Sequence, residues 1–421
     1  MRIPFTDATL ALVLATTMAA TGCNVIDALP SGDAESGAAG LASTGTAQAP
    51  AELDSALLER AGDGDLEAQY AVGRAYTGEG GVERDLPQAV HWFSEAAEEG
   101  HGPSQSALGA MLIDGEGIEV DLAEGKIWLV RAAQQGDANG EYHLGRYFAA
   151  GLDDEPDPAA ALLWWRKAAA QGQPEAQHLL GLSRGQGLAP ERGLAVDDSQ
   201  EAARRWFRLA SEQGYAPSQH ELGRIYDQGR GVTRDAAEAV TWYRLAAEQG
   251  HAAAQAQLGY MYATGDGVPP SYDEAAKWSA RAAAQADPDG CNNLAVLYLK
   301  GFGVAQDFEE ALRWYTRAAE LGNASAQNML GTLYLTGQGV ARDPAAAERW
   351  WRRAAEHGYA ASQYNLGGMY SRELSDELTR EEALSWLSRA AGQGHGRAKQ
   401  ELAELEAQPE DETGSAPGET L

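Results

Sequence analysis

Cysteine and positive charge are both scarce in this chain. Of its 421 residues only Cys23 and Cys291 are cysteines, too few for a disulfide framework or a CxxC metal site. Lysine and arginine total 32 against 62 acidic residues, which gives a formal net charge of −30. Such a surface repels nucleic-acid phosphates and anionic lipid, so we expect neither as a partner.

Motifs of several enzyme classes are also missing. The sequence contains no SxxK, no HExxH and no phosphate-binding glycine loop after a strand. His178 and His220 could suggest a metal, but no third ligand with suitable spacing accompanies them. We therefore predict that the chain is not an enzyme and needs no cofactor or metal.

The N-terminus has the features of a targeting segment. Arg2 precedes the apolar run 8–20 (ATLALVLATTMAA), which is shorter than the ~20 residues that span a bilayer and so indicates a signal peptide. The run leads into Thr21, Gly22 and Cys23, and this ending resembles the lipobox of bacterial lipoproteins. The pattern departs from that motif at Ala20, where leucine is usual. The alternative is ordinary secretion with cleavage near Ala20.

The lipobox resemblance implies a location. It makes Cys23 the mature first residue and the site of lipid attachment, so the membrane is contacted through that lipid alone. Asn24 follows the cysteine where an aspartate would retain a lipoprotein in the inner membrane. The resemblance thus implies an outer-membrane lipoprotein that faces the periplasm, with surface exposure left open.

Composition divides the chain into four parts. Residues 1–22 are the expected signal peptide, and residues 23–52, rich in Ala, Gly, Ser and Thr, are the expected flexible tether. Residues 407–421 form an acidic tail that is expected to be disordered. Between them, residues 53–406 carry the folded domain.

Tryptophans mark a repeat within this domain. Nine of them lie 36 residues apart, with a single interval of 42: Trp92, Trp128, Trp164, Trp206, Trp242, Trp278, Trp314, Trp350 and Trp386. A second series, nearly all glycine, keeps the same intervals: Gly73, Gly109, Gly145, Gly181, Gly223, Gly259, Ala295, Gly331 and Gly367. Two series in constant phase indicate a solenoid of repeated supersecondary units.

Each unit is predicted to be a helix pair. The first helix carries the glycine, whose cost of roughly 1 kcal/mol suggests that another helix crosses closely there. The second begins at a capping residue such as Asp235, with Glu238 or an equivalent completing a capping box in six repeats. The periodic tryptophans are predicted to be wedges in the core between helices.

The pattern Q-x-x-L-G-x-x-Y-x-x-G-x-G-V-x-x-D-x-x-x-A-x-x-W-[YF]-x-x-A-A-x-x-G resembles the Sel1-like repeat, a relative of the tetratricopeptide repeat. Nine copies cover about 65–394. The resemblance implies an all-α, right-handed superhelical solenoid of nine helix-turn-helix repeats, with capping helices near 53–61 and 397–405. The fourth copy has six extra residues around 189–196, and the seventh has Cys291 for glutamine, which we predict to be a buried thiol.

The resemblance also implies a binding face. In tetratricopeptide folds the first helix of each pair lines the concave side, and positions three before and one after the glycine point into it. Rings, amides and guanidinium groups at these positions suit a peptide or a folded protein. The predicted partner-binding residues are Tyr70, Arg74, Tyr142, Arg146, His178, His220, Arg224, Tyr260, Asn292, Asn328 and Tyr364. The alternative is that these residues only bond neighbouring repeats together.

The predicted function is an envelope-anchored scaffold or adaptor for a protein or peptide partner. The resemblance allows a role in envelope assembly, polysaccharide export or host interaction. Two alternatives are a β-lactam-binding or hydrolytic enzyme of the Sel1-like class, and a soluble periplasmic stress or virulence factor.

Overall fold

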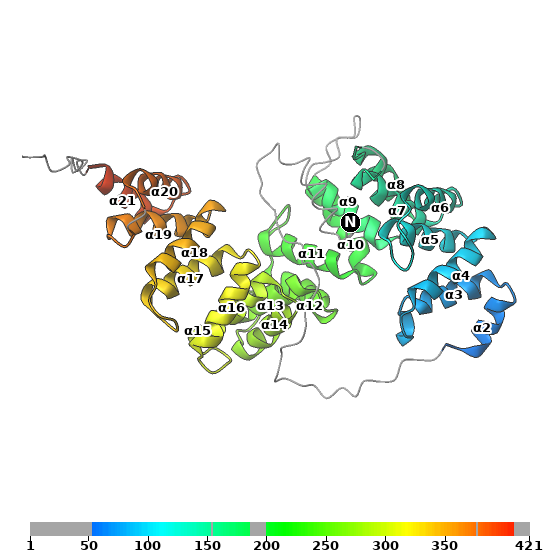
Figure 1. Cartoon of the computed structure of the whole chain (residues 1–421), viewed down its shortest axis with the longest axis horizontal. Coiled ribbons are helices and arrows are strands. Elements are labelled where there is room, and N and C mark those ends of the chain that lie inside the picture. The colour runs from blue at the N-terminus through cyan, green and yellow to red at the C-terminus, as the bar shows by residue number, and fades with distance from the viewer. Residues whose placement is uncertain (1–52, 153–154, 186–198, 376–377, 408–421) are drawn as a thin grey trace, which may run out of the picture. The chain divides into compact units, whose positions relative to one another are not determined.

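The computed structural model describes residues 53–152, 155–185, 199–375 and 378–407, and these residues form α-helices joined by turns (Figure 1). They contain twenty α-helices and no β-strand. The expected signal peptide, the tether, the insertion at 189–196 and the acidic tail after Ala407 lie outside the described residues.

The chain divides into two compact units, Met1–Thr233 and Arg234–Leu421, referred to below as unit 1 and unit 2. Unit 1 contains α2 (Ser55–Gly62), α3 (Leu66–Tyr76), the short 3-10 helix η1 (Glu79–Gly81), α4 (Leu86–Glu98), α5 (Gly102–Asp114), α6 (Leu122–Gln134), α7 (Ala138–Ala150), α8 (Pro158–Ala170), α9 (Pro174–Gly185), α10 (Ser199–Glu212) and α11 (Ala216–Gln228). Unit 2 contains α12 (Ala236–Glu248), α13 (Ala252–Thr264), α14 (Tyr272–Ala284), α15 (Pro288–Lys300), α16 (Phe308–Glu320), α17 (Ala324–Thr336), α18 (Pro344–Glu356), α19 (Ala360–Ser371), α20 (Arg380–Gly392) and α21 (Gly396–Ala407).

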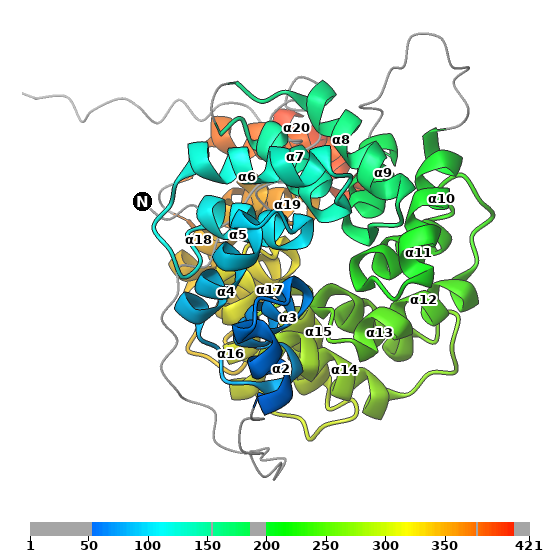
Figure 2. The ribbon, with the colours of Figure 1, turned by 90° about the vertical axis from the view of Figure 1, so that its right-hand side faces the viewer.

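Helices of two kinds alternate along each unit. We call the first helix of each repeat the A helix (α3, α5, α7, α9 and α11 in unit 1; α13, α15, α17 and α19 in unit 2) and the second the B helix. Within a unit, each B helix packs against its own A helix and against the A helix of the next repeat. Figure 2 shows this side-by-side stacking for α12 to α15. Helices α2 and α21 occupy the segments expected for capping helices.

Eight of the nine predicted capping residues are N-caps of B helices, whereas the ninth, Ser199, is the first residue of α10. The Asp235 carboxylate, for example, accepts a hydrogen bond from the backbone N–H of Glu238 at 3.0 Å. The predicted capping box is largely wrong, because among the described helices its reciprocal bond forms in α20, between Thr379 and Glu382. Elsewhere the glutamate side chain turns to another donor, as where the Nε1 of Trp242 donates to Glu238 at 2.9 Å.

The A-helix glycine does allow a close crossing, but the periodic tryptophan is not the wedge. A Cβ on Gly145 would collide with the indole of Trp165, and one on Gly181 with the ring of Phe207. The wedge is therefore the residue after the periodic tryptophan. This residue is buried in every repeat: Phe93, Leu129, Trp165, Phe207, Tyr243, Ser279, Tyr315, Trp351 and Leu387.

The periodic tryptophans lie instead at the edge of the core. Most are half-buried, while Trp128 and Trp278 are buried. In several repeats a basic side chain three residues later covers the ring, as with Arg131 over Trp128, 4.6 Å from the ring centroid. The tryptophan thus closes the rim of the helix pair, and its ring stabilises the cation above it.

Buried glutamines join successive repeats. The Nε2 of Gln255 donates to the carbonyl of Ala247 at 3.0 Å, and its Oε1 accepts from the Nε2 of Gln285 at 2.8 Å. Further donors to a carbonyl eight residues earlier are Gln69, Gln105, Gln177, Gln219, Gln327 and Gln363. Each acceptor is a carbonyl near the end of α2 or of a B helix that also accepts the N–H of the glycine at the following junction, so the glutamine supplies a second donor.

Cys291 replaces the glutamine in the seventh repeat and is fully buried, which confirms the prediction of a buried thiol. Burial raises its pKa to about 11, so the thiol stays protonated at neutral pH. Leu321 stands where Gln285 stands in the sixth repeat. An apolar residue beside the thiol thus replaces a glutamine pair.

Each junction from a B helix to the next A helix needs a residue with positive φ. Glycine fills this position at Gly100, Gly250 and five other junctions, with φ from 79° to 95°, but Ala286 fills it after α14, with φ of 58°. Because the left-handed region costs an L-residue roughly 1–2 kcal/mol, Ala286→Gly is expected to raise the free energy of unfolding by about 1 kcal/mol.

Urea unfolding of the variant and of the parent protein measures this gain. Ala284→Gly is the control, because it makes the same substitution in an ordinary helical position and should lower stability by up to about 1 kcal/mol. A loss of stability in Ala286→Gly would contradict the strain assigned to this junction.

Candidate partner-binding surface

All eleven predicted partner-binding residues lie on A helices. Unit 1 holds Tyr70, Arg74, Tyr142, Arg146, His178, His220 and Arg224, and unit 2 holds Tyr260, Asn292, Asn328 and Tyr364. The two sets belong to separate units, so each forms its own surface.

The unit 1 rings are mainly structural. Tyr142 is 9% exposed and His178 is 8% exposed. His178 shares a hydrogen bond of 2.9 Å with the Ser218 hydroxyl of the next repeat. These contacts match the alternative reading in which the residues bond neighbouring repeats together.

The unit 1 arginines already have partners. Arg74 is paired with Glu79, Arg146 lies 3.8 Å from Asp114, and Arg224 donates to Glu221 at 2.9 Å. Each guanidinium therefore meets an internal carboxylate, and a partner's carboxylate would have to displace it.

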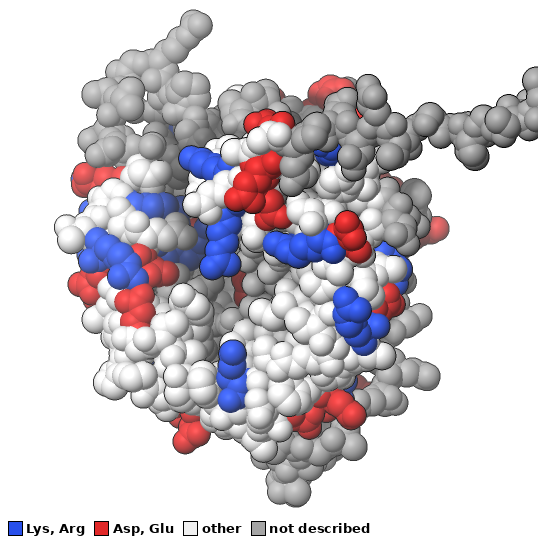
Figure 3. All heavy atoms as spheres, turned by 90° about the vertical axis from the view of Figure 1, so that its left-hand side faces the viewer, with Lys and Arg blue, Asp and Glu red and all other residues white. Residues whose placement is uncertain are grey.

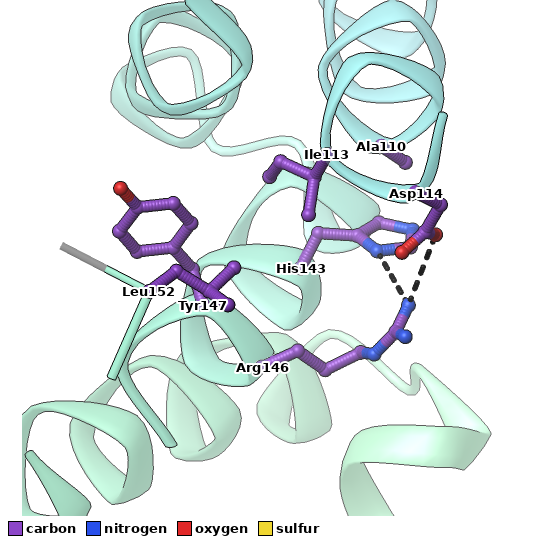
Figure 4. Close-up of a pocket in the computed structure, with 7 residues that line it drawn as sticks. All are labelled: Ala110, Ile113, Asp114, His143, Arg146, Tyr147 and Leu152. Carbon is purple, nitrogen blue, oxygen red and sulfur yellow. Dashed lines mark hydrogen bonds and ion pairs between the residues drawn. The ribbon is translucent and has the colours of Figure 1, made fainter. Parts of the chain in front are cut away.

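Figure 4 shows the surroundings of Arg146. The Nη1 of Arg146 donates to the Nδ1 of His143 at 3.3 Å. Burial and the nearby guanidinium lower the His143 pKa to about 3, so the imidazole is neutral at physiological pH, and burial raises the Asp114 pKa. The cavity beside them measures about 10 Å³, room for one water but not for a ligand.

Unit 2 presents an open surface on neighbouring A helices. Tyr260 on α13 is 53% exposed, and Val296, the equivalent residue on α15, is 37% exposed. The Nδ2 of Asn293 donates to the Ala256 carbonyl at 3.1 Å, which holds the two helices in register. Asn292 is half-buried beside them and makes no hydrogen bond to a described residue. We call Tyr260, Asn292 and Val296 the neutral patch.

The other two predicted residues of unit 2 are engaged internally. The Oδ1 of Asn328 accepts from Ser362 at 2.9 Å and from Asn365 at 3.0 Å. The Tyr364 hydroxyl accepts from Arg372 at 3.3 Å, and its ring stacks on His395 with centroids 4.6 Å apart. Of the predicted residues in unit 2, Tyr260 and Asn292 therefore remain open.

Charge is partitioned between the two helix layers of unit 2. Helices α13, α15, α17 and α19 together contain one acid, Asp289, and one base, Lys300. The B helices α14, α16, α18 and α20 contain nine acids and nine bases. Figure 3 shows acidic and basic side chains beside one another on one side of the molecule. The neutral patch thus lies on a layer almost free of charge in a chain of net charge −30.

Two functional signals were missed in the sequence. Val296 shares the register of Tyr260, and that register could have identified it. The pentapeptide 181–185 (GLSRG) matches GxSxG, the nucleophile elbow of α/β-hydrolases. Here it lies inside helix α9, not at a strand-to-helix turn. Ser183 is 1% exposed and donates to the Leu180 carbonyl at 2.9 Å, so the motif is part of the helix packing.

The described residues hold neither a metal cluster nor a membrane-spanning helix. No group of three or more His, Cys, Asp or Glu side chains there is arranged to hold a metal ion. No helix among them is long and apolar enough to cross a membrane.

Nine consecutive segments match the Sel1 repeat: residues 66–101, 102–137, 138–173, 174–215, 216–251, 252–287, 288–323, 324–359 and 360–395. A similar solved structure is c5321, a protective antigen present in uropathogenic Escherichia coli strains with an SLR fold, at 33% identity and a TM-score of 0.63 over 83% of this chain and 73% of that one. A second is a Sel1 repeat protein from Oxalobacter formigenes, at 30% identity and a TM-score of 0.53 over 79% of this chain and 93% of that one. No curated protein sequence matches the chain.

Proposed function

Because the chain belongs to the Sel1 repeat family, we propose that it is a non-catalytic scaffold that binds a protein partner through the neutral patch of unit 2. Sel1 repeat solenoids typically serve as scaffolds for protein interactions. The observation that carries the proposal is the exposure of Tyr260 and Val296 on an almost uncharged layer, together with Asn292 on α15, which makes no hydrogen bond to a described residue.

The chemistry of the patch indicates what kind of segment it binds. A tyrosine ring offers a large contact area at a small cost in side-chain entropy. The Asn292 amide can donate to a backbone carbonyl and accept from a backbone N–H. With few charges to desolvate, the patch suits an extended, uncharged segment of the partner, and its affinity should depend little on salt.

The scaffold is proposed to act in the bacterial envelope. The lipobox-like Cys23 supports this assignment and lies outside the described residues. A lipid on Cys23 would tether the solenoid to the outer membrane. Mass spectrometry of the mature N-terminus tests it: a diacylated or triacylated cysteine supports the tether, and an N-terminus produced by cleavage near Ala20 contradicts it.

Site-specific photo-crosslinking tests the binding surface. A photoreactive phenylalanine derivative in place of Tyr260 is expected to capture the partner in intact cells. The same derivative at Tyr272, a comparably exposed tyrosine at the start of a B helix, serves as the control. Equal capture at both positions, or capture at Tyr272 alone, would contradict the assignment.

The captured partner then allows an affinity measurement. Tyr260→Ala is expected to weaken binding by about 2 kcal/mol, roughly thirtyfold, as is typical of an aromatic anchor. Ile127→Ala, which truncates an apolar side chain 51% exposed on α6, should leave the affinity unchanged. Circular dichroism of each variant confirms that the fold is retained.

A further inference from the structure

Four arginines occupy the same position in four successive B helices of unit 2. They are Arg281 on α14, Arg317 on α16, Arg353 on α18 and Arg389 on α20, each three residues after the periodic tryptophan and in the last turn of its helix. All four side chains are exposed. We call them the arginine row.

The arginine row forms no ion pair with the described residues, although the chain has nearly twice as many acids as bases. Several other bases of unit 2 form ion pairs: Arg234 pairs with Asp266, Lys277 with Glu274 and Arg313 with Glu310. Within the described residues, no member of the row forms an ion pair. This holds although Glu320 and Glu356 each follow a row arginine by three residues.

Local structure explains why arginines occupy these positions. It does not explain why their guanidinium N–H groups have no carboxylate partner among the described residues. A cation in the last turn of a helix offsets the negative end of the helix dipole. The Arg281 guanidinium lies 4.6 Å from the Trp278 ring centroid, and that of Arg389 lies 4.8 Å from the Trp386 centroid. Stacking occupies the flat face of a guanidinium and leaves its N–H groups directed outward, in the geometry that matches a carboxylate.

The same register in unit 1 does not form such a row. The equivalent residues there are Glu95, Arg131, Lys167 and Leu209. An unbroken row of arginines is therefore a feature of repeats six to nine.

An acidic segment follows the last helix of unit 2 in the sequence. Residues 408–421 include Glu410, Asp411, Glu412 and Glu419 and no lysine or arginine. They follow α21, which packs on α20, and the Nη2 of Arg380 on α20 donates to the Leu405 carbonyl at 2.7 Å. Fourteen extended residues reach about 45–50 Å, enough to run across several neighbouring helices.

We propose that the arginine row is a docking surface for an extended acidic polypeptide and that residues 408–421 of the same chain occupy it. The net charge of −30 opposes a broad anionic surface such as a membrane or a nucleic-acid duplex, whereas a single strand touches the row alone. Each exposed ion pair is weak. A short tether supplies an effective concentration on the order of millimolar, so weak pairs suffice.

Peptide binding to the full chain tests the proposal. The probe is a fluorescein-labelled peptide of residues 408–421, followed by anisotropy at low salt. In a tail-neutralised chain (Glu410→Gln, Asp411→Asn, Glu412→Gln, Glu419→Gln) the row is free, and the peptide should bind. The wild-type chain should bind it about tenfold more weakly, because its own tail competes at millimolar effective concentration.

Substitution of the four row arginines tests whether the peptide binds to this surface. In the tail-neutralised chain, Arg281→Gln, Arg317→Gln, Arg353→Gln and Arg389→Gln together should weaken binding tenfold or more. The matched control removes as much charge from paired bases of unit 2, with Arg234→Gln, Lys277→Gln, Arg313→Gln and Arg349→Gln. The control should change binding less than threefold. Circular dichroism and thermal melting establish that both sets fold.

Three outcomes would overturn the proposal. If the row variant and the control variant lost equal peptide affinity, the peptide would be attracted by the net charge of the chain alone. Equal peptide affinity in the wild-type and tail-neutralised chains would remove the tail as occupant. A polyuronate that displaces the peptide at a far lower carboxylate concentration would assign the row to an anionic polysaccharide. None of these results bears on the neutral patch, which lies on the other helix layer.

Discussion

Gly331→Ala is expected to lower the free energy of unfolding by roughly 1–3 kcal/mol, although alanine is the better helix former. A Cβ at residue 331 would lie 2.5 Å from Cδ1 and 2.7 Å from Cε2 of Trp351. The indole cannot move aside cheaply, because Trp351 is 3% exposed and its Nε1 donates to the Asn328 carbonyl at 3.0 Å. Urea unfolding followed by circular dichroism measures the loss.

Repeat seven suggests a compensating change for this variant. There Ala295 replaces the glycine, Tyr315 is the wedge, and both are buried. Adding Trp351→Tyr to Gly331→Ala should therefore recover part of the lost stability, with a coupling of at least about 0.5 kcal/mol in a double-mutant cycle. Gly392→Ala is the control, because no atom lies within 4 Å of the position that the new Cβ would occupy. If Gly331→Ala were as stable as Gly392→Ala, the close crossing would not be needed.

The repeat, its two helices and the close crossing were predictable from the sequence, whereas the identity of the wedge was not. The glycine series indicated that a second helix packs closely against the A helix at this position. The constant tryptophan was the natural candidate, yet the wedge is the following residue, which varies from Trp165 to Ser279. The crossing accepts side chains of different size and chemistry, so no single residue type recurs at this position. The constant tryptophan therefore marked the rim of the core, and the variable residue after it lies inside the core.

The A-helix register of the binding face was predictable, but the exposure of each side chain was not. Tyr142 and Tyr260 are both tyrosines at predicted face positions, yet one is 9% and the other 53% exposed. Tyr142 contacts the ring of His143 and the guanidinium of Arg146, which cover it. Such covering depends on neighbouring side chains in three dimensions. The partition of charge, in contrast, can be read directly from the sequences of the A and B helices once the repeat is aligned.

Gln255→Cys is expected to lower the free energy of unfolding by about 1–3 kcal/mol, because it removes two buried hydrogen bonds that each contribute about 0.5–1.5 kcal/mol. Gln255 is 4% exposed, and its amide donates to the Ala247 carbonyl and accepts from the Gln285 side chain. A cysteine is a weak donor. The equivalent Sγ of Cys291 lies 3.9 Å from the Ala283 carbonyl.

The seventh repeat tolerates its cysteine because the facing residue is also apolar. Leu321 stands where Gln285 stands, so no amide there faces the thiol. Adding Gln285→Leu to Gln255→Cys should therefore cost less than the sum of the two single changes, by 0.5 kcal/mol or more. Gln338→Cys, at an exposed turn position, is the control and should change stability by less than about 0.5 kcal/mol. Strict additivity of the two single changes would contradict the pairing, and each glutamine would then act through its backbone contact alone.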